Sequence, residues 1–363
     1  MEAKQEYYTS PIGITSQFRF CGNCFRIDTY KGCNFGCEYC FINNRHKNNP
    51  RMTDRLTNIK PANIKQIERL FKNAIDNKQT NTLEKELINR YTPLHLGGNS
   101  DPFQSIEKKH RVTFEFLKLS KHYQYPVMIS TKTGNIEDEY FNVLDKNIHA
   151  FQISLISDSE KFIKKYEKNT NVKKRIELIK KLKSLGFWVS LRVQPLIDVN
   201  EALSVIKEVH KYIDFITIEH IKLQNDNLES VKKVKELLNI PESHWIRKGN
   251  SDIIKTEIKK SNIELIKKYT NIPIGCGDND LHELSDTKNC CGIDVINENF
   301  NNWLKYNSMA LNMGINQPTN LESKMNVFPY IKKDFLHTYD DYVKYYTDNI
   351  YKPYKPDLQK TLF

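Results

Sequence analysis

Three cysteines in one short stretch place the strongest constraint on this chain. Residues 32–41 contain Cys33, Cys37 and Cys40, spaced C-x3-C-x2-C. Thiolates are soft ligands suited to iron–sulfur clusters and to zinc. Three of them can hold three irons of a [4Fe–4S] cluster and leave the fourth iron open for chemistry. The alternatives are a zinc site that lacks its fourth ligand, or three free thiols.

Composition narrows the class of protein. The chain has 363 residues, of which 27% are charged and 39% hydrophobic, as is usual for a soluble globular protein. No run of about 18 apolar residues suggests a membrane span, and the N-terminus lacks the apolar core of a signal peptide, so a cytoplasmic location is expected. Eight cysteines in such a chain favour metal binding or catalysis over disulfides. The net charge of +11 favours acidic partners such as nucleic acid.

Strand and helix patterns alternate along most of the chain. Short apolar runs that predict strands lie at residues 18–20 and 25–30, 94–96, 127–132, 151–156, 188–193 and 215–220. Helical periodicity is found after Pro61 and at 108–122, 136–144, 159–185 (one helix or two), 200–212, 227–238 and 252–269. Six strand–helix units predict an α/β fold with a parallel sheet, most simply a partial (β/α)6 TIM-like barrel.

The predicted domain organisation follows this pattern. Residues 1–17 are expected to be a lead-in, residues 18–270 the partial barrel, and residues 271–363 a Cys- and Tyr-rich C-terminal extension. Residues 272–276 could add a seventh short strand. Thr338 and Asp341 resemble a helix N-terminal capping box, which would begin a C-terminal helix. The same tail interleaves aromatic and basic residues, which would suit single-stranded nucleic acid or a helix packed on the barrel.

Polar residues gather where the predicted strands end, and barrels place their chemistry at that edge. The convergence favours a barrel over a doubly wound sheet, and no GxGxxG or P-loop pattern supports the latter. Besides the cysteine loop, these strand ends carry Gly97, Gly98, Ser100, Asp101, Lys132, Ser154, Arg192, Gln194, Glu219 and His220.

The cysteine spacing, with Tyr39 directly before the third cysteine, resembles the signature of radical S-adenosylmethionine (SAM) enzymes. Several further segments together resemble the spore-photoproduct-lyase-like branch, which is related to DNA repair photolyases. This resemblance extends over about residues 18–225 and is carried by residues 29–40, 99–104, 111–113, 130–134, 151–156, Glu167, Arg175 and 192–195. A true spore photoproduct lyase has a hydrogen-donor cysteine before the Ser-Asp pair. This chain has Gly98-Asn99 there, so photoproduct repair by that route is not expected.

The resemblance implies a cofactor set and a chemistry. A [4Fe–4S] cluster on Cys33, Cys37 and Cys40 would bind SAM, and an electron from a donor such as flavodoxin or ferredoxin would cleave SAM to a 5′-deoxyadenosyl radical. That radical would abstract hydrogen from a substrate, in a lyase, transferase or oxidoreductase reaction. The residues expected to contact SAM are Tyr39, Gly97, Gly98, Ser100, Lys132, Ser154, Arg192 and Gln194. The alternatives are an ordinary strand-to-loop turn for the glycines, a surface loop for Lys132, and hydrogen bonds to buried backbone groups for Arg192 and Gln194.

The remaining candidates concern the substrate and a second metal. Asp101, His220 and Cys276 are the candidate catalytic residues. The five further cysteines are Cys21, Cys24, Cys276, Cys290 and Cys291. Four of them could hold zinc or an auxiliary iron–sulfur cluster, although Cys21 and Cys24 precede the first strand and the other three come late in the chain. Plain buried cysteines are the alternative.

The expected function is therefore a radical SAM enzyme that modifies or repairs an unidentified substrate, with nucleic acid as one candidate. A peptide or a small molecule is the alternative substrate. A different class of function, a metal-stabilised nucleic-acid-binding protein without catalysis, also fits the cysteines and the positive charge.

Overall fold

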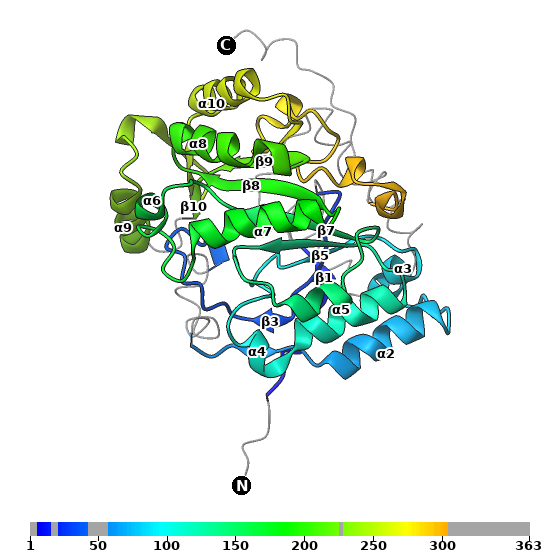
Figure 1. The fold of residues 1–363 in the computed structure, drawn as a ribbon. Helices are drawn as coiled ribbons and strands as arrows, with labels where there is room; N and C mark the ends of the chain where they lie inside the picture. The colour runs from blue at the N-terminus through cyan, green and yellow to red at the C-terminus, as the bar shows by residue number, and fades with distance from the viewer. Residues whose placement is uncertain (1–5, 16–20, 43–56, 225–227, 304–363) are drawn as a thin grey trace, which may run out of the picture.

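An eight-stranded sheet forms the centre of the fold in the computed structural model, which describes residues 6–15, 21–42, 57–224 and 228–303 (Figure 1). Its strand order is β1-β2-β5-β6-β7-β8-β9-β13, and every neighbouring pair is parallel except β1–β2. The strands are β1 (Ile12–Ile14), β2 (Phe25–Ile27), β5 (Leu94–Leu96), β6 (Val127–Thr131), β7 (His149–Ser154), β8 (Trp188–Leu196), β9 (Phe215–His220) and β13 (Ile274–Cys276).

This sheet confirms the predicted α/β class and the partial barrel. Strands β2, β5, β6, β7, β8 and β9 correspond to the six predicted strands, and β13 is the seventh. Within the described residues no strand joins β1 to β13, so the barrel stays open along one side. The predicted boundary near residue 270 stays a prediction, although β13 pairs with β9 inside the main sheet.

Helices cover one face of the sheet. In Figure 1, α5, α7 and α8 lie in front of the strands. The α7 and α8 helices begin at side chains that cap their first turns, with Asn171 accepting from Lys174 N and Asp198 from Asn200 N, both at 2.8 Å. The α-helices are α2 (Ile64–Ile75), α3 (Leu83–Asn89), α4 (Glu107–His110), α5 (Val112–His122), α6 (Glu160–Ile163), α7 (Val172–Ser184), α8 (Val199–Val209), α9 (Leu228–Leu238) and α10 (Thr256–Tyr269).

The two faces of the sheet differ in polarity. Side chains alternate along a strand, so Ile129, Ile153 and Leu191 point to the helices and belong to the main apolar core. The residues between them are polar and form a hydrogen-bonded row on the other face, from His95 through Ser130 and Gln152 to Thr217. A parallel sheet buried by helices on both faces would be apolar on both. We call the polar face, which includes Arg192 and Glu219 by register, the inner face.

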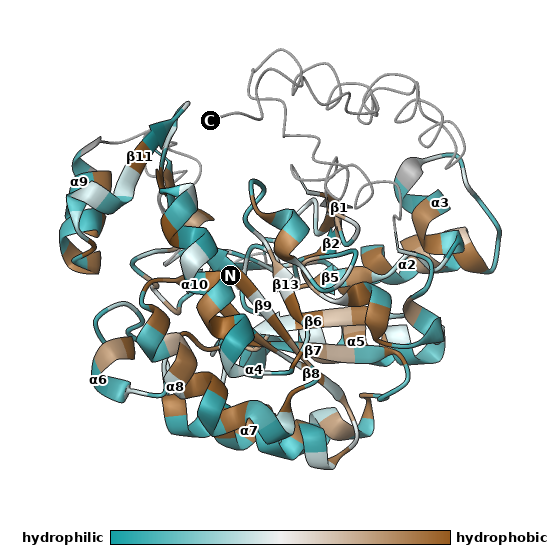
Figure 2. Ribbon diagram, turned by 90° about the horizontal axis from the view of Figure 1, so that it is seen from above, coloured by the Kyte–Doolittle hydropathy of each residue, from teal (hydrophilic) through white to brown (hydrophobic). Residues whose placement is uncertain are grey.

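An apolar cluster closes the inner face at the N-terminal end of the strands. Met128 and Ala150, early in β6 and β7, pack with four residues that follow β13, namely Cys291, Ile293, Phe300 and Trp303. Two short 3-10 helices carry that segment, Ile293–Val295 and Glu298–Phe300. The opposite, C-terminal end of the inner face therefore holds the polar groups available to a ligand. Figure 2 shows brown apolar residues concentrated along the strands and on the helix faces toward them.

Several elements differ from the expectation. The 136–144 segment is a 3-10 helix over Asp138–Asn142, and 159–185 divides into α6 and α7 where Asn171 caps the second helix. Residues 251–254 are not helical, because they form β12 (Ser251–Ile254) between β10 (Lys222–Gln224) and β11 (Trp245–Lys248). The lead-in contains β1, and the first predicted strand ends in β3 (Tyr30–Lys31), which pairs with β4 (Lys60–Pro61).

Some expectations lie outside the described residues. These are the strand at 18–20 and the C-terminal helix that would begin at Thr338, with its tyrosine-rich tail. Among the helices that are described, none has the length and apolarity needed to cross a membrane.

Candidate active site

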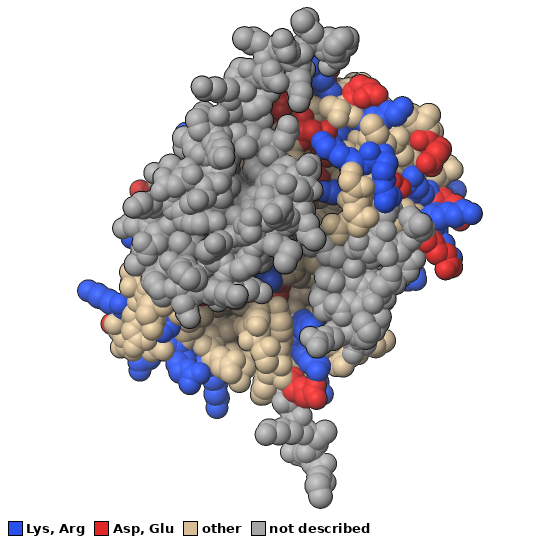
Figure 3. Space-filling model, turned by 180° about the vertical axis from the view of Figure 1, so that it is seen from behind, with Lys and Arg blue, Asp and Glu red and all other residues tan. Residues whose placement is uncertain are grey.

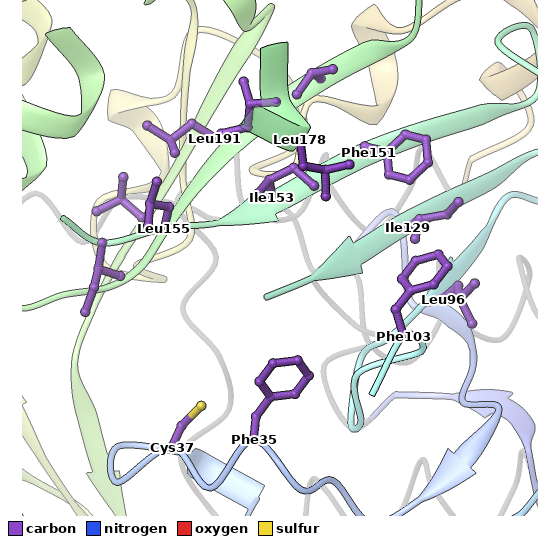
Figure 4. Close-up of a cluster of buried hydrophobic side chains, with 14 of the residues drawn as sticks. Phe35, Cys37, Leu96, Phe103, Ile129, Phe151, Ile153, Leu155, Leu178 and Leu191 are labelled. Carbon is purple, nitrogen blue, oxygen red and sulfur yellow. The ribbon is translucent and has the colours of Figure 1, made fainter. Parts of the chain in front are cut away.

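The cysteine loop leaves β3 at the C-terminal edge of the sheet, as predicted. Gly32 and Gly36 both have positive φ, which lets the chain turn sharply between the cysteines, and Cys40 N donates to Cys37 O at 3.1 Å. In Figure 4 the side chains of Phe35 and Cys37 point from this loop toward the ends of the strands. The three thiols therefore belong to one compact turn next to the strand ends.

The surroundings of Cys33 suit a metal-bound thiolate. Burial and, to a smaller extent, the nearby Asp101 carboxylate raise the pKa of Cys33, while the backbone N–H groups of Phe35 and Asp101 donate to the sulfur and lower it, with a net value of about 12. Hydrogen bonds of this kind tune cluster thiolates. Within the described residues, no three His, Cys, Asp or Glu side chains are close enough together to form a metal site, and the three loop cysteines are no exception. The thiol donors fit a cluster in chemistry and spacing.

The loop after β5 is fastened to the cysteine loop through Asp28. Its carboxylate accepts from Asn99 N at 2.8 Å and from Asn99 Nδ2 at 2.9 Å, and it forms an ion pair with Arg26. Ser100 Oγ donates to Tyr30 O at 2.6 Å, and Gln104 Nε2 donates to Gly32 O at 3.0 Å. Ser100 thus supports the cysteine loop itself. Asp28 was not predicted as a site residue. Its signal in the sequence is that it directly follows β2, two residues after Arg26, so that the two side chains share one face.

Asp101 joins the same loop to the end of β6. Its buried carboxylate accepts from Thr131 Oγ1 at 2.9 Å, Lys132 N at 2.7 Å and Phe103 N at 3.0 Å. These bonds occupy both oxygens, so the geometry supports a positioning role for Asp101 in place of the catalytic role expected from the sequence.

A fully buried carboxylate, Glu167, holds the other side of the cysteine loop. It accepts a hydrogen bond from Tyr39 OH and forms ion pairs with Arg175 and with Lys132, the latter at 3.2 Å. Burial alone would raise the pKa of Glu167, but the Arg175 guanidinium and the Lys132 ammonium hold it at about 2. Arg175 also donates to Ser154 O at 2.6 Å. We call Tyr39, Lys132, Glu167 and Arg175 the Glu167 clamp.

The Glu167 clamp changes the interpretation of two predicted SAM contacts. Lys132 Nζ lies 3.0 Å from Tyr39 OH, and both groups are directed at Glu167. Tyr39 and Lys132 therefore position the cysteine loop relative to the strands. In the sequence Glu167 and Arg175 stand out only as part of a family resemblance, because the hydrogen bond between Tyr39 and Glu167 joins residues more than 120 positions apart.

The two glycines after β5 have different surroundings. Gly97 has φ +92°, and a Cβ there would overlap Ser130 O, so its lack of a side chain allows close packing on β6. A Cβ at Gly98 would meet only Arg26 and His95, at 3.8 Å. Of the pair, Gly98 is the one with room for a ligand on the inner face.

Arg192, Gln194 and Glu219 form the polar end of the inner face, and the register of β7 with β8 places Ser154 beside them. Arg192 Nε donates to Gln194 Oε1, which orients the guanidinium. Burial and the Asp278 carboxylate raise the pKa of Glu219 to about 7, although Arg192 opposes that shift. This group of residues can offer both a cation and a proton-exchanging carboxyl group to a ligand.

Two predicted catalytic residues point away from the inner face. His220 Nδ1 lies 2.7 Å from Asp278 Oδ2, and its Nε2 lies 3.2 Å from Asn262 on α10, so the ring belongs to the helix side. Cys276 packs with Ile263 and Leu281 in a small buried cluster on that same side. Strand alternation explains both positions, since neighbouring residues of one strand face opposite ways.

A cavity of about 650 Å³ lies outside the cysteine loop. The loop contributes Asn34 and Phe35 to its lining, and the segment between α6 and α7 contributes Lys168 and Asn169. That segment is hydrogen-bonded to the cysteine loop, since Glu38 N donates to Tyr166 O at 2.9 Å and Asn169 Nδ2 donates to Asn34 O at 2.7 Å.

Comparison with known protein families gives a match over the region that carries this site. Residues 27–198 match the family model of the Radical SAM superfamily. This range includes the cysteine loop, the Glu167 clamp and Arg192. None of the curated proteins matches the chain significantly.

Solved structures give weaker likenesses. Streptococcus suis SuiB is 14% identical with a TM-score of 0.40, over 57% of this chain and 44% of SuiB. The structure of SuiB bound to S-adenosylmethionine gives the same identity and score, over 58% and 45%. Methylornithine synthase (PylB) is 11% identical with a TM-score of 0.38, over 62% of this chain and 65% of that protein. The chain thus spans less than half the length of SuiB.

Replacing Glu167 tests whether the Glu167 clamp holds the cysteine loop in position. Glu167→Gln removes the charge that compensates Arg175 and Lys132, and breaking a buried ion pair costs about 3 kcal/mol or more. We expect a lower free energy of unfolding in urea and less iron retained after anaerobic reconstitution. Glu177→Gln, at an exposed position of α7, is the control. Equal stability and equal iron content of the two variants would refute the clamp.

Proposed function

Because residues 27–198 match the model of the Radical SAM superfamily, we propose that the chain is a radical SAM enzyme. In this proposal Cys33, Cys37 and Cys40 hold the [4Fe–4S] cluster, and the enzyme cleaves SAM reductively. One observation carries this proposal. The three thiols share a single turn at the C-terminal edge of the parallel sheet, and backbone N–H groups donate to the sulfur of Cys33. When cluster and SAM are bound, they supply a 5′-deoxyadenosyl radical that abstracts hydrogen from the substrate.

The residues of the chain bind and orient SAM and the substrate, and they exclude water from the site. Asp28 and Asp101 hold the β5 loop, and the Glu167 clamp holds the cysteine loop, so both are rigid before SAM arrives. Gly98, Ser154, Arg192 and Gln194 are the proposed SAM contacts on the inner face. The guanidinium of Arg192 suits a carboxylate or a ribose hydroxyl. Gly97, Ser100, Tyr39 and Lys132 act through packing and support.

SAM cleavage is the direct test. The protein is reconstituted anaerobically with iron and sulfide and mixed with SAM and dithionite, and 5′-deoxyadenosine is measured by mass spectrometry. We expect product from the wild type, and a loss of at least a hundredfold in Cys33→Ala (on the order of 3 kcal/mol). Reactions without reductant are the control. Equal product from wild type and variant would overturn the assignment of the cluster.

Nucleic acid is the substrate class that we propose, and a peptide or a small molecule is the alternative. The net charge of +11 supports a polyanionic partner, and Arg26 and Arg192 add positive charge to the inner face. The spore-photoproduct-lyase-like branch rests only on the sequence segments that resemble it. Whether the reaction is that of a lyase depends on the substrate.

Oligonucleotide binding tests the substrate class. Fluorescence anisotropy with labelled single-stranded and duplex oligonucleotides should give affinities that fall linearly with the logarithm of salt concentration. Polyglutamate of similar charge is the competitor that separates recognition from bulk charge. Absence of binding at low salt, or full competition by polyglutamate, would favour the small-molecule or peptide alternative.

We also propose that a small acidic redox protein, of the flavodoxin or ferredoxin type, delivers the electron next to α6 and the α6–α7 segment. This region touches the outside of the cysteine loop. Together with the first turn of α7 it carries six exposed lysines: Lys161, Lys164, Lys165 and Lys168 in the region itself, and Lys173 and Lys174 on α7. One of them, Lys168, pairs with Glu38 of the loop at 2.8 Å. By contrast, basic and acidic side chains are interspersed over the right-hand part of the face in Figure 3.

Charge reversal separates electron entry from chemistry. In a triple variant, Lys165→Glu, Lys168→Glu and Lys174→Glu, SAM cleavage driven by flavodoxin hydroquinone should fall about tenfold, because charge steering governs encounter rates. Cleavage driven by dithionite should not change. The matched control reverses exposed Lys72, Lys118 and Lys260 on three other helices. An equal loss in both variants would remove the special role of the α6–α7 lysines.

A further inference from the structure

Two cysteine-bearing segments from opposite ends of the sequence meet on the inner face. The turn before β2 carries Cys21 and Cys24, and the loop after β13 carries Cys290 and Cys291. Both reach Met128 of β6, since Asn23 Nδ2 lies 3.3 Å from Met128 Sδ and Cys291 packs in the same buried cluster as Met128. The sequence alone left it open how these pairs could approach each other. In the structure, the segment that follows β13 folds back to the N-terminal end of the strands and so brings the two pairs together.

Close backbone packing fixes the later pair on this face. Any side chain at Gly275 of β13 would overlap the carbonyl group of Cys290, so the loop rests directly on the strand. Gln152 Nε2, also on the inner face, reaches Cys291 O at 3.5 Å. Cys290 and Cys291 are therefore held beside polar strand residues and not among the helices.

The thiols share one electrostatic environment. Burial and the neighbouring Cys24 thiol raise the pKa of Cys21 to a net value of about 12, which the nearby Arg192 guanidinium opposes. Burial also raises the pKa of Cys290. The nearby Cys21 and Glu219 raise it as well, while the Arg192 guanidinium lowers it. Burial makes these thiols resist ionisation even though Arg192 is nearby, whereas a bound soft metal ion deprotonates them outright.

We propose that Cys21, Cys24, Cys290 and Cys291 are the ligands of a second metal site on the inner face, one that takes a thiophilic metal as zinc or as an iron–sulfur cluster. A C-x2-C pair with a second pair of thiols supplies the four sulfurs that both kinds of centre use. Cys276 is excluded because it faces Ile263 and Leu281 on the helix side of β13. The proposal does not depend on the cluster at Cys33, Cys37 and Cys40.

Metal binding requires a small rearrangement. The Cys291 thiol donates to Asn289 Oδ1 at 2.7 Å and would have to turn away from it. The described thiols are not yet gathered around a common point, and the same is true of the loop cysteines. A metal ion supplies the energy that draws its ligands together.

The test removes the loop cysteines first. A variant with Cys33→Ala, Cys37→Ala and Cys40→Ala is purified anaerobically, and its zinc and iron are measured before and after reconstitution with iron and sulfide. We expect it to retain a metal centre, recognised as zinc by elemental analysis or as an iron–sulfur cluster by visible absorption and Mössbauer spectra. Adding Cys21→Ser and Cys290→Ser should abolish that centre. Adding Cys276→Ser instead should preserve it.

A variant that binds neither zinc nor iron, or one that keeps its metal without Cys21 and Cys290, would overturn the proposal. If the loop variant does not fold, the comparison moves to the otherwise natural chain. There Cys290→Ser should lower the metal content and Cys276→Ser should not, and equal contents would overturn the second site. SAM cleavage is assayed separately on the wild type. A protein that holds the second metal but cleaves no SAM contradicts the proposed function and leaves this inference standing.

Discussion

The structure depends on a parallel sheet that can bury only one of its faces in apolar side chains. Residues such as Ile129, Ile153 and Leu191 point to the helices and supply the core, so the residues between them are free to be polar. His95, Ser130, Gln152 and Thr217 use that freedom to form a hydrogen-bonded row. Because an apolar cluster around Met128 closes one end of this face, ligands have access at the other end, where the cysteine loop lies.

Buried carboxylates then convert a loop into a positioned site. Asp28, Asp101 and Glu167 each join the cysteine loop, or the loop beside it, to a strand or helix of the domain. Each is nearly enclosed, with 1%, 7% and 0% exposure respectively, so their hydrogen bonds and ion pairs lie in surroundings of low polarity. Truncating any of them would leave buried donors or cations without partners. The loop geometry is therefore set by the protein before a cofactor binds.

The sequence was sufficient for the parallel arrangement of β2, β5, β6, β7, β8 and β9, because alternating strands and helices leave few topologies. It also located the strand ends at which the candidate site residues gather. It was less informative about orientation. His220 and Cys276 are at strand ends as predicted, yet one-residue alternation turns both to the helix side. Lys132 and Tyr39 were expected to contact SAM, but their pairing with Glu167 depends on a contact between distant segments that no local pattern encodes. The meeting of Cys21 with Cys290 depends in the same way on a C-terminal segment that folds back onto Met128.

In the function that we propose, radical chemistry occurs between the cysteine loop and the polar inner face. A crystal structure of the anaerobically reconstituted protein with SAM tests this most directly. We expect three irons bonded to Cys33, Cys37 and Cys40, the fourth iron bonded to SAM, and SAM lying against Gly98 and Arg192. A cluster bonded to other cysteines, or SAM bound on the helix side of the sheet, would contradict it.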